Sequence, residues 1–554
     1  MKCCMAEKYD HWCENEALVK YVDNGNYFCI FHAPIGRKGI SSYEFNNKIL
    51  LKINHALKED LECNLEGTIF EWEISFVQLL KSKDLPKLNF KSAIFNSKTD
   101  FSGLNFNGVN FGSAEFKNGT NFKNCFFLKA AYFSKAIFEG LVNFSNTIFY
   151  FGARFSKALF KNQATFSFSN FKTIFLCSEA KFLGKTFFRN IRFDGDVHFR
   201  ETIFNNLLSF KGTRFNCKVY FFDTQFKRRS FFLENNFFQL VDFGKAIFEG
   251  EGFFINSIFH NKVSFLKTQF LGEITFKETE FQNTANFNRA NFAEKLFFSE
   301  VVFKEEAKFD KAAFKGYAVI AGETFKNIGS FKQIFIQDKM RFENSFLHKI
   351  SFLDTDLRNI DFINCDFQKY KNRLVLYDEI NLNSRNVKDD DYRKIEVLYR
   401  RLKQKYKDEH DEYSASNWHF SEKEMFRNGS WKRKFLPGLT NLYRISSGYG
   451  ERPVRSAIVL IFLVLVISIL VGISGVGSEH KDLIDFKGLN TFADISFKNI
   501  WSLILGIFQY ATFTKEPILK PVNLLGETLK TIAQILIPVQ VALFALAVRN
   551  RFRR

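Results

Sequence analysis

Phenylalanine recurs along about a third of the chain at intervals that alternate between five and six residues. Phe133, Phe138 and Phe144 show one such pair of steps, and the pattern runs from Phe122 to Phe314, with Cys177 in one phenylalanine position. The chain has 75 Phe among 554 residues, against 4 Met and 5 Trp. An excess of one residue type at a fixed period indicates a structural repeat, here of eleven residues.

An eleven-residue period also occurs in right-handed coiled coils, but the phenylalanine steps do not fit an α-helix. At about 100° per residue, five and six residues turn by about 140° and 240°, so successive rings would face opposite sides. Short extended segments that each turn a corner fit the pattern directly, with the phenylalanine and a small residue two positions earlier pointing inward. These small residues are Ala136, Thr147, Ala158, Ala180, Thr202, Thr213, Thr224, Ala246, Thr268, Thr279, Ala290 and Ala312.

At both ends of the repeat the steps become regular fives, in "FSGLNFNGVNFGSAEF" (101–116) and "FLDTDLRNIDFINCDF" (352–367). These stretches resemble the pentapeptide-repeat family, whose unit carries Leu or Phe at its centre and a small residue two positions earlier. The resemblance implies a mainly β solenoid over residues 89–370, a right-handed quadrilateral β-helix built of alternating five- and six-residue steps. About twelve coils of about 22 residues, at about 4.8 Å each, would make a rod of about 60 Å with an aromatic core.

The last hundred residues, 454–554, are predicted to form an α-helical membrane module. The stretch 456–475 is apolar and uncharged, and 531–548 is a second apolar stretch containing Gln534, Pro538 and Gln540. Basic residues precede the first stretch and follow the second, so the positive-inside rule places both chain ends in the cytoplasm. We therefore expect a multi-pass protein of the cell (inner) membrane, with its N-terminal bulk and its C-terminus cytoplasmic.

Between the two spans, the shorter apolar segment 499–513 predicts a re-entrant helix. This layout resembles the pore module of two-helix pore-loop channels and places "YATFTKEP" (510–517) at the selectivity filter. The chain departs from the T-x-G-Y-G filter of potassium channels, because no glycine lies between Gly506 and Gly526. The alternative is a membrane hairpin anchor whose polar residues bind its helices together. The resemblance implies these pore-lining candidates: Tyr510, Ala511, Thr512, Phe513, Thr514, Gln534 and Gln540.

Residues 371–453 are predicted to form a short α-helical linker and a juxtamembrane segment. The stretch 391–427 indicates two amphipathic helices with a break near Asp411. Ile395, Leu398 and Leu402 recur at helical spacing, and we expect this face to pack on the end of the rod or on a neighbouring subunit.

The leader, residues 1–88, contains the cluster of metal-type ligands and a predicted helix. Cys29 and His32 form a C-x2-H pair, and Cys13 with Cys4 would complete a tetrahedral Cys3His zinc site, with Cys3 as the rival to Cys4. The "CIFH" element resembles short zinc-binding leaders found ahead of pentapeptide repeats. Four protein ligands leave no open coordination position, so the zinc would be structural.

The net charge of +19 suggests two candidate partners, nucleic acid and an anionic membrane surface. Mimicry of DNA requires an acidic surface, which the basic balance excludes. The basic residues beside the spans account for part of the excess charge, so nucleic acid is not the expected partner.

The sequence gives no sign of catalytic machinery. "GKT" at 184–186 lacks the earlier glycine of a phosphate-binding loop, and we expect no enzyme. The leading hypothesis is a channel-like, oligomeric pore module, which the channel resemblance implies to be a tetramer. The cytoplasmic β-helix would gate or dock this module. The alternative is a membrane-tethered rod that binds an unknown protein partner and has a non-conducting hairpin anchor.

Overall fold

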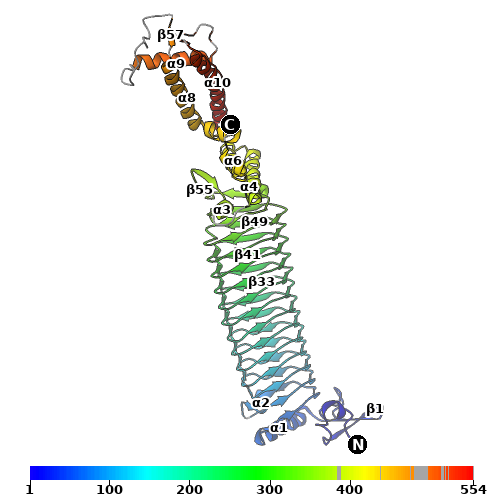
Figure 1. Ribbon diagram of the computed structural model, residues 1–554. Helices are drawn as coiled ribbons and strands as arrows, with labels where there is room; N and C mark the ends of the chain where they lie inside the picture. The colour runs from blue at the N-terminus through cyan, green and yellow to red at the C-terminus, as the bar shows by residue number, and fades with distance from the viewer. Residues whose placement is uncertain are drawn as a thin grey trace. The chain divides into compact units, whose positions relative to one another are not determined.

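The computed structural model describes residues 1–80, 82–382, 388–436, 438–474, 476–478, 497–512, 514, 517, 519–521 and 523–552. The chain divides into two compact units. The first comprises Met1–Thr355 with Asn359–Asp366, and the second Asp356–Arg358 with Phe367–Arg554. The first unit is a β-helix with its leader, and the second is mainly helical (Figure 1).

The β-helix is built of short parallel strands that form four sheets. One coil contains β15 (Ala131–Tyr132), β16 (Ile137–Phe138), β17 (Val142–Asn143) and β18 (Ile148–Phe149). Each strand pairs with its equivalent one coil further on, as β15 does with β19 (Ala153–Arg154), a shift of 22 residues. The sheets contain 14, 13, 14 and 11 strands, so the solenoid has about 14 coils. The predicted four-sided β solenoid is confirmed.

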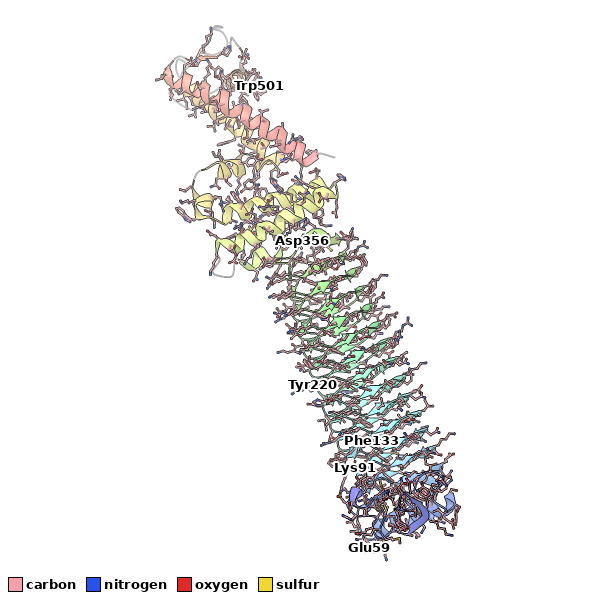
Figure 2. All side chains as sticks on the ribbon, turned by 90° about the vertical axis from the view of Figure 1, so that its right-hand side faces the viewer. Glu59, Lys91, Phe133, Tyr220, Asp356 and Trp501 are labelled. Atoms are coloured by element: carbon pink, nitrogen blue, oxygen red, sulfur yellow. The ribbon has the colours of Figure 1, made fainter. Side chains whose placement is uncertain are left out.

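The phenylalanine rings form four columns inside the coils, one along each wall (Figure 2 labels Phe133). The rings of Phe133 and Phe155 lie 4.7 Å apart with an interplanar angle of 1°, and those of Phe122 and Phe144 also lie 4.7 Å apart. Rings of opposite walls meet edge to face across the core, as Phe133 and Phe144 do at 5.4 Å. Both arrangements are favourable for aromatic pairs, so the aromatic repeat is the core.

The alternation of five and six residues comes from two kinds of corner. Each five-residue step contains one residue in the left-handed conformation, two positions after the phenylalanine, such as Lys135 (φ 60°) and Asn146 (φ 57°). The six-residue step from Phe138 to Phe144 has no such residue and turns through one additional position. A left-handed residue therefore recurs every eleven residues, twice in each coil.

The solenoid begins one coil earlier than predicted. Its first strands are β3 (Cys63–Asn64), β4 (Ile69–Phe70) and β5 (Ile74–Ser75), within the segment predicted as leader. β3 pairs with β7 (Leu88–Asn89), 25 residues further on, because this coil also contains the short helix α2 (Phe76–Leu79). The insertion hides the period, although Phe76 still stacks on Phe101 at 4.6 Å.

At the other end, the four-residue strands finish with β52 (Met340–Glu343) and β54 (Ile360–Ile363). The last strand lies just before the predicted boundary at residue 370. The solenoid therefore runs from Cys63 to Ile363.

The leader covers the N-terminal end of the aromatic core. It contains η1 (Glu7–Tyr9), the hairpin β1 (Leu18–Asp23) and β2 (Asn26–Cys29), and helix α1 (Ser42–Lys58), which begins with a Ser41–Glu44 capping box. The buried ring of Phe45 meets Phe70 of the first coil edge to face at 5.8 Å. Solenoids need such a cap, because the terminal coil would otherwise expose its core.

The second unit starts with the hairpin β55 (Gln368–Tyr370) and β56 (Arg373–Val375) and the helix α3 (Tyr377–Leu382). Helices α4 (Asp389–Asp408) and α5 (Glu412–Asn428) then pack along each other, and Asp411 caps α5. The ring of Tyr399, on the buried face of α4, stacks on Trp418 of α5 at 5.6 Å. Ile395, Leu398 and Leu402, which form the predicted apolar face of α4, are also buried. The elements that follow are α6 (Trp431–Phe435), α7 (Leu439–Ser447), α8 (Pro453–Ser474), β57 (Val476–Ser478), α9 (Phe497–Ala511), β58 (Leu519–Pro521) and α10 (Leu524–Phe552).

Candidate metal centre and membrane module

Four buried side chains of the leader converge at one point. The ligand atoms of Cys3, Cys13, Cys29 and His32 all lie within 4.8 Å of one another. The Nδ1 atom of His32 is 3.2 Å from the Cys29 sulfur and 3.7 Å from the Cys3 sulfur. Ligands of a tetrahedral zinc ion at about 2.0–2.3 Å lie roughly 3.5–3.8 Å apart, so the cluster has the dimensions of a metal site.

The surroundings of His32 prepare it to bind through Nδ1. Its Nε2 lies 3.0 Å from the carbonyl oxygen of Glu66, which can only accept a hydrogen bond. Nε2 is therefore the protonated nitrogen, and Nδ1 keeps its lone pair for a metal. The ring of Tyr9 stacks on His32 at 5.0 Å, in the space left by Gly67, where a Cβ atom would collide with that ring.

The sequence analysis put Cys4 first among the candidate ligands and Cys3 as its rival, and the structure brings Cys3, not Cys4, into the cluster. Cys3 is buried and its sulfur accepts a hydrogen bond from the backbone N–H of Cys29 at 3.3 Å, whereas Cys4 is exposed.

The thiol groups of the cluster differ in their pKa values. A hydrogen bond from the Cys29 thiol lowers the pKa of Cys3 to about 3, while burial raises the pKa of Cys13 to about 12. One thiolate is thus stabilised by its neighbours, and a dication would replace the protons that remain on the other thiols.

The second unit contains two helices long and apolar enough to cross a membrane, α8 and α10. Only 28% and 22% of their most apolar stretches are buried, whereas a core helix of a soluble protein would be mostly buried. Both helices extend beyond the predicted spans, since α8 starts at Pro453 and α10 covers Leu524–Phe552. Residue 475, the predicted end of the first span, lies outside the described residues.

The segment between the two helices folds back on itself. β57 pairs antiparallel with β58, so the chain that leaves α8 meets the chain that enters α10. Helix α9 contacts both long helices, and its Ile507 and Tyr510 are buried in the shared core. The other core members are Val464, Ile467, Val471, Ala533 and Ile537.

The pore-lining candidates occupy different environments. Tyr510 is buried in the helix core, Ala511 packs beside it, and Gln534 is half-buried. Thr512 and Thr514 are exposed just after α9, with their hydroxyl oxygens 3.0 Å apart. Phe513 lies outside the described residues.

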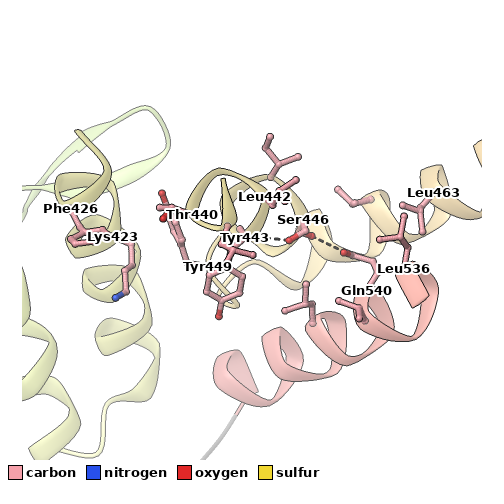
Figure 3. A pocket seen from close by; sticks show the side chains of 15 residues that line it. Lys423, Phe426, Thr440, Leu442, Tyr443, Ser446, Tyr449, Leu463, Leu536 and Gln540 are labelled. Atoms are coloured by element: carbon pink, nitrogen blue, oxygen red, sulfur yellow. Dashed lines mark hydrogen bonds between the residues drawn. The ribbon is translucent and has the colours of Figure 1, made fainter. Parts of the chain in front are cut away.

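Gln540 is buried, and its amide holds the two long helices to the segment before them. It donates to the carbonyl oxygen of Ser446 at 2.8 Å (Figure 3). It also donates to the carbonyl oxygen of Ser456 at 2.9 Å and lies 3.0 Å from the Ser456 hydroxyl. An apolar groove of about 720 Å³ opens beside this contact, between α5, α7, α8 and α10.

The sequence analysis missed a set of buried ion pairs in the helices before α8. Glu422 receives hydrogen bonds from Arg400 and Lys403, at 3.0 and 2.6 Å. Glu424 receives them from Arg444 and from the Tyr449 hydroxyl. The only signal in the sequence was that charged residues are mixed with aromatic ones on the predicted amphipathic helices.

Comparison with known proteins agrees with the architecture of the first unit. The family model of pentapeptide repeats (nine copies) matches residues 111–159. No curated protein and no solved structure matches the chain. Residues 111–159 are pentapeptide repeats within a β-helix of about 14 coils, in a chain that ends with two long apolar helices.

Proposed function

We propose that the protein is a membrane-anchored β-helical scaffold, held at the cytoplasmic face of the cell membrane by α8 and α10. The contact that favours an anchor over a pore is the one made by Gln540. A glutamine in a membrane span is expected to line water or to bind another helix. Both amide hydrogens of Gln540 have acceptors within its own chain, so this residue needs no aqueous path.

The solenoid presents an exposed apolar patch suited to a protein partner. Phe126 and Leu128 belong to the wall of β14 (Phe126–Phe127), and Tyr150 and Phe151 follow β18, which pairs with β14. All four side chains are exposed. Clustered exposed apolar side chains on a folded surface are typical of interaction sites.

Two experiments test this proposal. Truncation before Pro453 should move the protein from the membrane fraction to the soluble fraction, and continued membrane association would contradict the anchor. A photo-cross-linking residue at Phe151 should give a specific protein adduct in cells. The same probe at Lys161, on another wall near the same coil, should not. Equal labelling at both positions, or none at Phe151, would contradict a binding surface here.

A second candidate function, an oligomeric pore, is favoured by the fold of the segment between the spans. β57 and β58 join its two ends, as a re-entrant segment requires, and Thr512 and Thr514 remain exposed at the end of α9. Four such modules around an axis could bring these hydroxyls together.

Planar bilayers distinguish the two functions. In a pore, Thr512→Cys should make the conductance sensitive to a water-soluble thiol reagent, whereas Leu505→Cys on the apolar side of α9 should not. The anchor predicts no conductance, and replacement of residues 510–514 should then leave membrane permeability unchanged.

We infer that the leader cluster binds a structural Zn²⁺ ion. Its support is the set of four buried ligand atoms and the fixed tautomer of His32. Zinc would tie the segment around η1 to the end of the β1–β2 hairpin, because Cys3 and Cys13 flank η1 while Cys29 ends β2 and His32 follows it.

A further inference from the structure

The helices before the membrane module enclose a strongly cationic cavity of about 210 Å³. Its lining comes from the β55–β56 hairpin and from helices α3 to α8. It contains six cations and two carboxylates: Lys371, Arg373, Arg427, Lys434, Arg444 and Arg455, with Glu379 and Glu424. The formal charge is therefore 6 − 2 = +4.

Both carboxylates are already neutralised by neighbours. Glu379 is bound by the Arg373 guanidinium through two hydrogen bonds and by the Tyr399 hydroxyl at 2.6 Å. Glu424 accepts from Arg444 at 2.7 Å. Burial alone would raise the pKa of Glu424, but the charges of Arg444 and Arg427 lower it, so this carboxylate is ionised. Six cations thus share two carboxylates at the wall of the cavity.

The guanidinium of Arg427 is incompletely hydrogen-bonded. Its Nε–H is buried and has no hydrogen-bond partner in the part of the chain that the structure describes. Its two terminal nitrogens make only long contacts of 3.4 Å, to Glu424 and to the carbonyl of Lys434. Buried polar groups are normally satisfied, and a guanidinium pairs best with a planar or tetrahedral oxyanion.

The cavity adjoins an apolar groove, and helices α5, α7 and α8 contribute to the lining of both. On α8, Arg455 lines the cavity while Val459 and Leu463 line the groove. These three residues follow at intervals of four, so they lie on one helix face about 6 Å apart. On α7, Arg444 lines the cavity and Tyr443 lines the groove. Figure 3 shows Tyr443 and Leu463 among the side chains that line the groove. A cationic cavity that continues into an apolar groove along a membrane helix is complementary to a lipid, whose anionic headgroup would bind the cations and whose acyl chain would fill the groove.

We propose that this cavity binds the phosphate group of an anionic phospholipid of the cytoplasmic leaflet, with an acyl chain in the adjoining groove. The inference rests on the proposed membrane anchoring and adds a ligand to it. A dissolved phosphate would use the cations but leave exposed the apolar side chains of α7: Leu439, Leu442 and Ile445.

The test uses the full chain purified in detergent and native mass spectrometry with added lipid. The wild type should retain phosphatidylglycerol at least tenfold more tightly than phosphatidylcholine. Arg427→Gln, and separately the double variant Lys434→Gln/Arg455→Gln, should weaken phosphatidylglycerol binding by about fivefold for each cation removed, the factor that corresponds to ~1 kcal/mol. Arg427→Lys should retain more binding than Arg427→Gln.

The matched control is Lys432→Gln/Arg549→Gln, which removes the same charge from exposed sites that do not line the cavity. Unchanged melting temperatures show that the variants are folded. Equal loss in the control, or equal retention of both lipids by the wild type, would overturn the proposal.

A further arm adds glycerol 3-phosphate, which has the phosphate and no acyl chain. If it binds as tightly as the lipid, the site takes a soluble anion and the lipid assignment is wrong. A chain that stays soluble without detergent and retains no lipid of either kind would instead refute the membrane anchoring itself.

Discussion

One coil of the β-helix has its large and small core residues exchanged, which allows a sharp test of the packing. Elsewhere on this wall the inward strand position holds a small residue, such as Ala153 or Val197, and the ring comes two positions later. In this coil Phe175 occupies the strand position and Cys177 the phenylalanine position. The ring of Phe175 lies 5.7 Å from Phe155 and so fills the column from the other side.

The two single substitutions should both destabilise the solenoid. Phe175→Ala removes a fully buried ring and should cost ~3–5 kcal/mol, because its neighbours above and below cannot close the cavity. Cys177→Phe adds a ring where Phe175 already lies, and overpacking of this kind costs ~1–3 kcal/mol or more.

The double variant Phe175→Ala/Cys177→Phe should restore the arrangement of the other coils and lie within ~1 kcal/mol of the wild type. The coupling energy between the two sites is then at least ~3 kcal/mol, as expected for residues that share one space. Val241→Phe/Phe243→Cys, which creates the exchanged arrangement in a regular coil, serves as the matched control.

Hydrogen exchange of the full chain measures these effects locally, through the opening free energy of the amides between 170 and 200. Thermal unfolding followed by circular dichroism measures them globally. If the losses of the two single variants simply add in the double variant, the two residues do not fill the same space and the packing argument fails.

Three further predictions concern the other parts of the molecule. Phe168 is exposed and adopts φ 62°, so Phe168→Asn should stabilise the solenoid by about 1 kcal/mol, and Asn146→Phe at the equivalent corner should destabilise it similarly in thermal unfolding. Cys3→Ser should abolish stoichiometric zinc in the purified protein, measured by elemental analysis, while Cys4→Ser should keep it; the reverse result would contradict the assigned ligands. Burial opposes the ionisation of Glu422, but hydrogen bonds from His419, Lys403 and Arg400 lower its pKa well below its usual value. Its contribution to stability should therefore be complete above about pH 4.5 and decline as the pH falls below that value. Glu422→Gln should flatten this acid-side fall in melting temperature, whereas Asp408→Asn on the exposed side of α4 should not.

The regular part of the solenoid was predictable because each phenylalanine position is repeated with the same environment. Phe133 and Phe155 are 22 residues apart and stack, so period alone identifies both the coil and its inward residues. The first coil was not predictable, because α2 adds residues between Phe70 and Leu88 and breaks the period. Cys177 also looked like a simple defect, since only the structure shows that Phe175 fills its place.

The candidate sites were less predictable because they depend on contacts distant in sequence. The Cys13, Cys29 and His32 ligands follow from residue type, but the choice of Cys3 over Cys4 depends on which way the chain runs past Cys29. Gln540 was identified as a polar residue in a span, while its acceptors lie 84 and 94 positions earlier. The cationic cavity combines residues from six helices and a hairpin, which no local pattern brings together.

The left-handed corner residue that recurs every eleven positions gives the coil an approximate twofold symmetry about its own axis. Opposite walls are equivalent, because each half coil contains one tight and one wide corner. The regular region can therefore change length only in fixed steps. Deleting 22 residues between equivalent corners should remove one coil, about 4.8 Å of length, and leave every remaining wall in line. Deleting eleven should also keep all rings inward but rotate the coils that follow by half a turn, whereas a deletion of five or six would place tight corners where wide ones are needed.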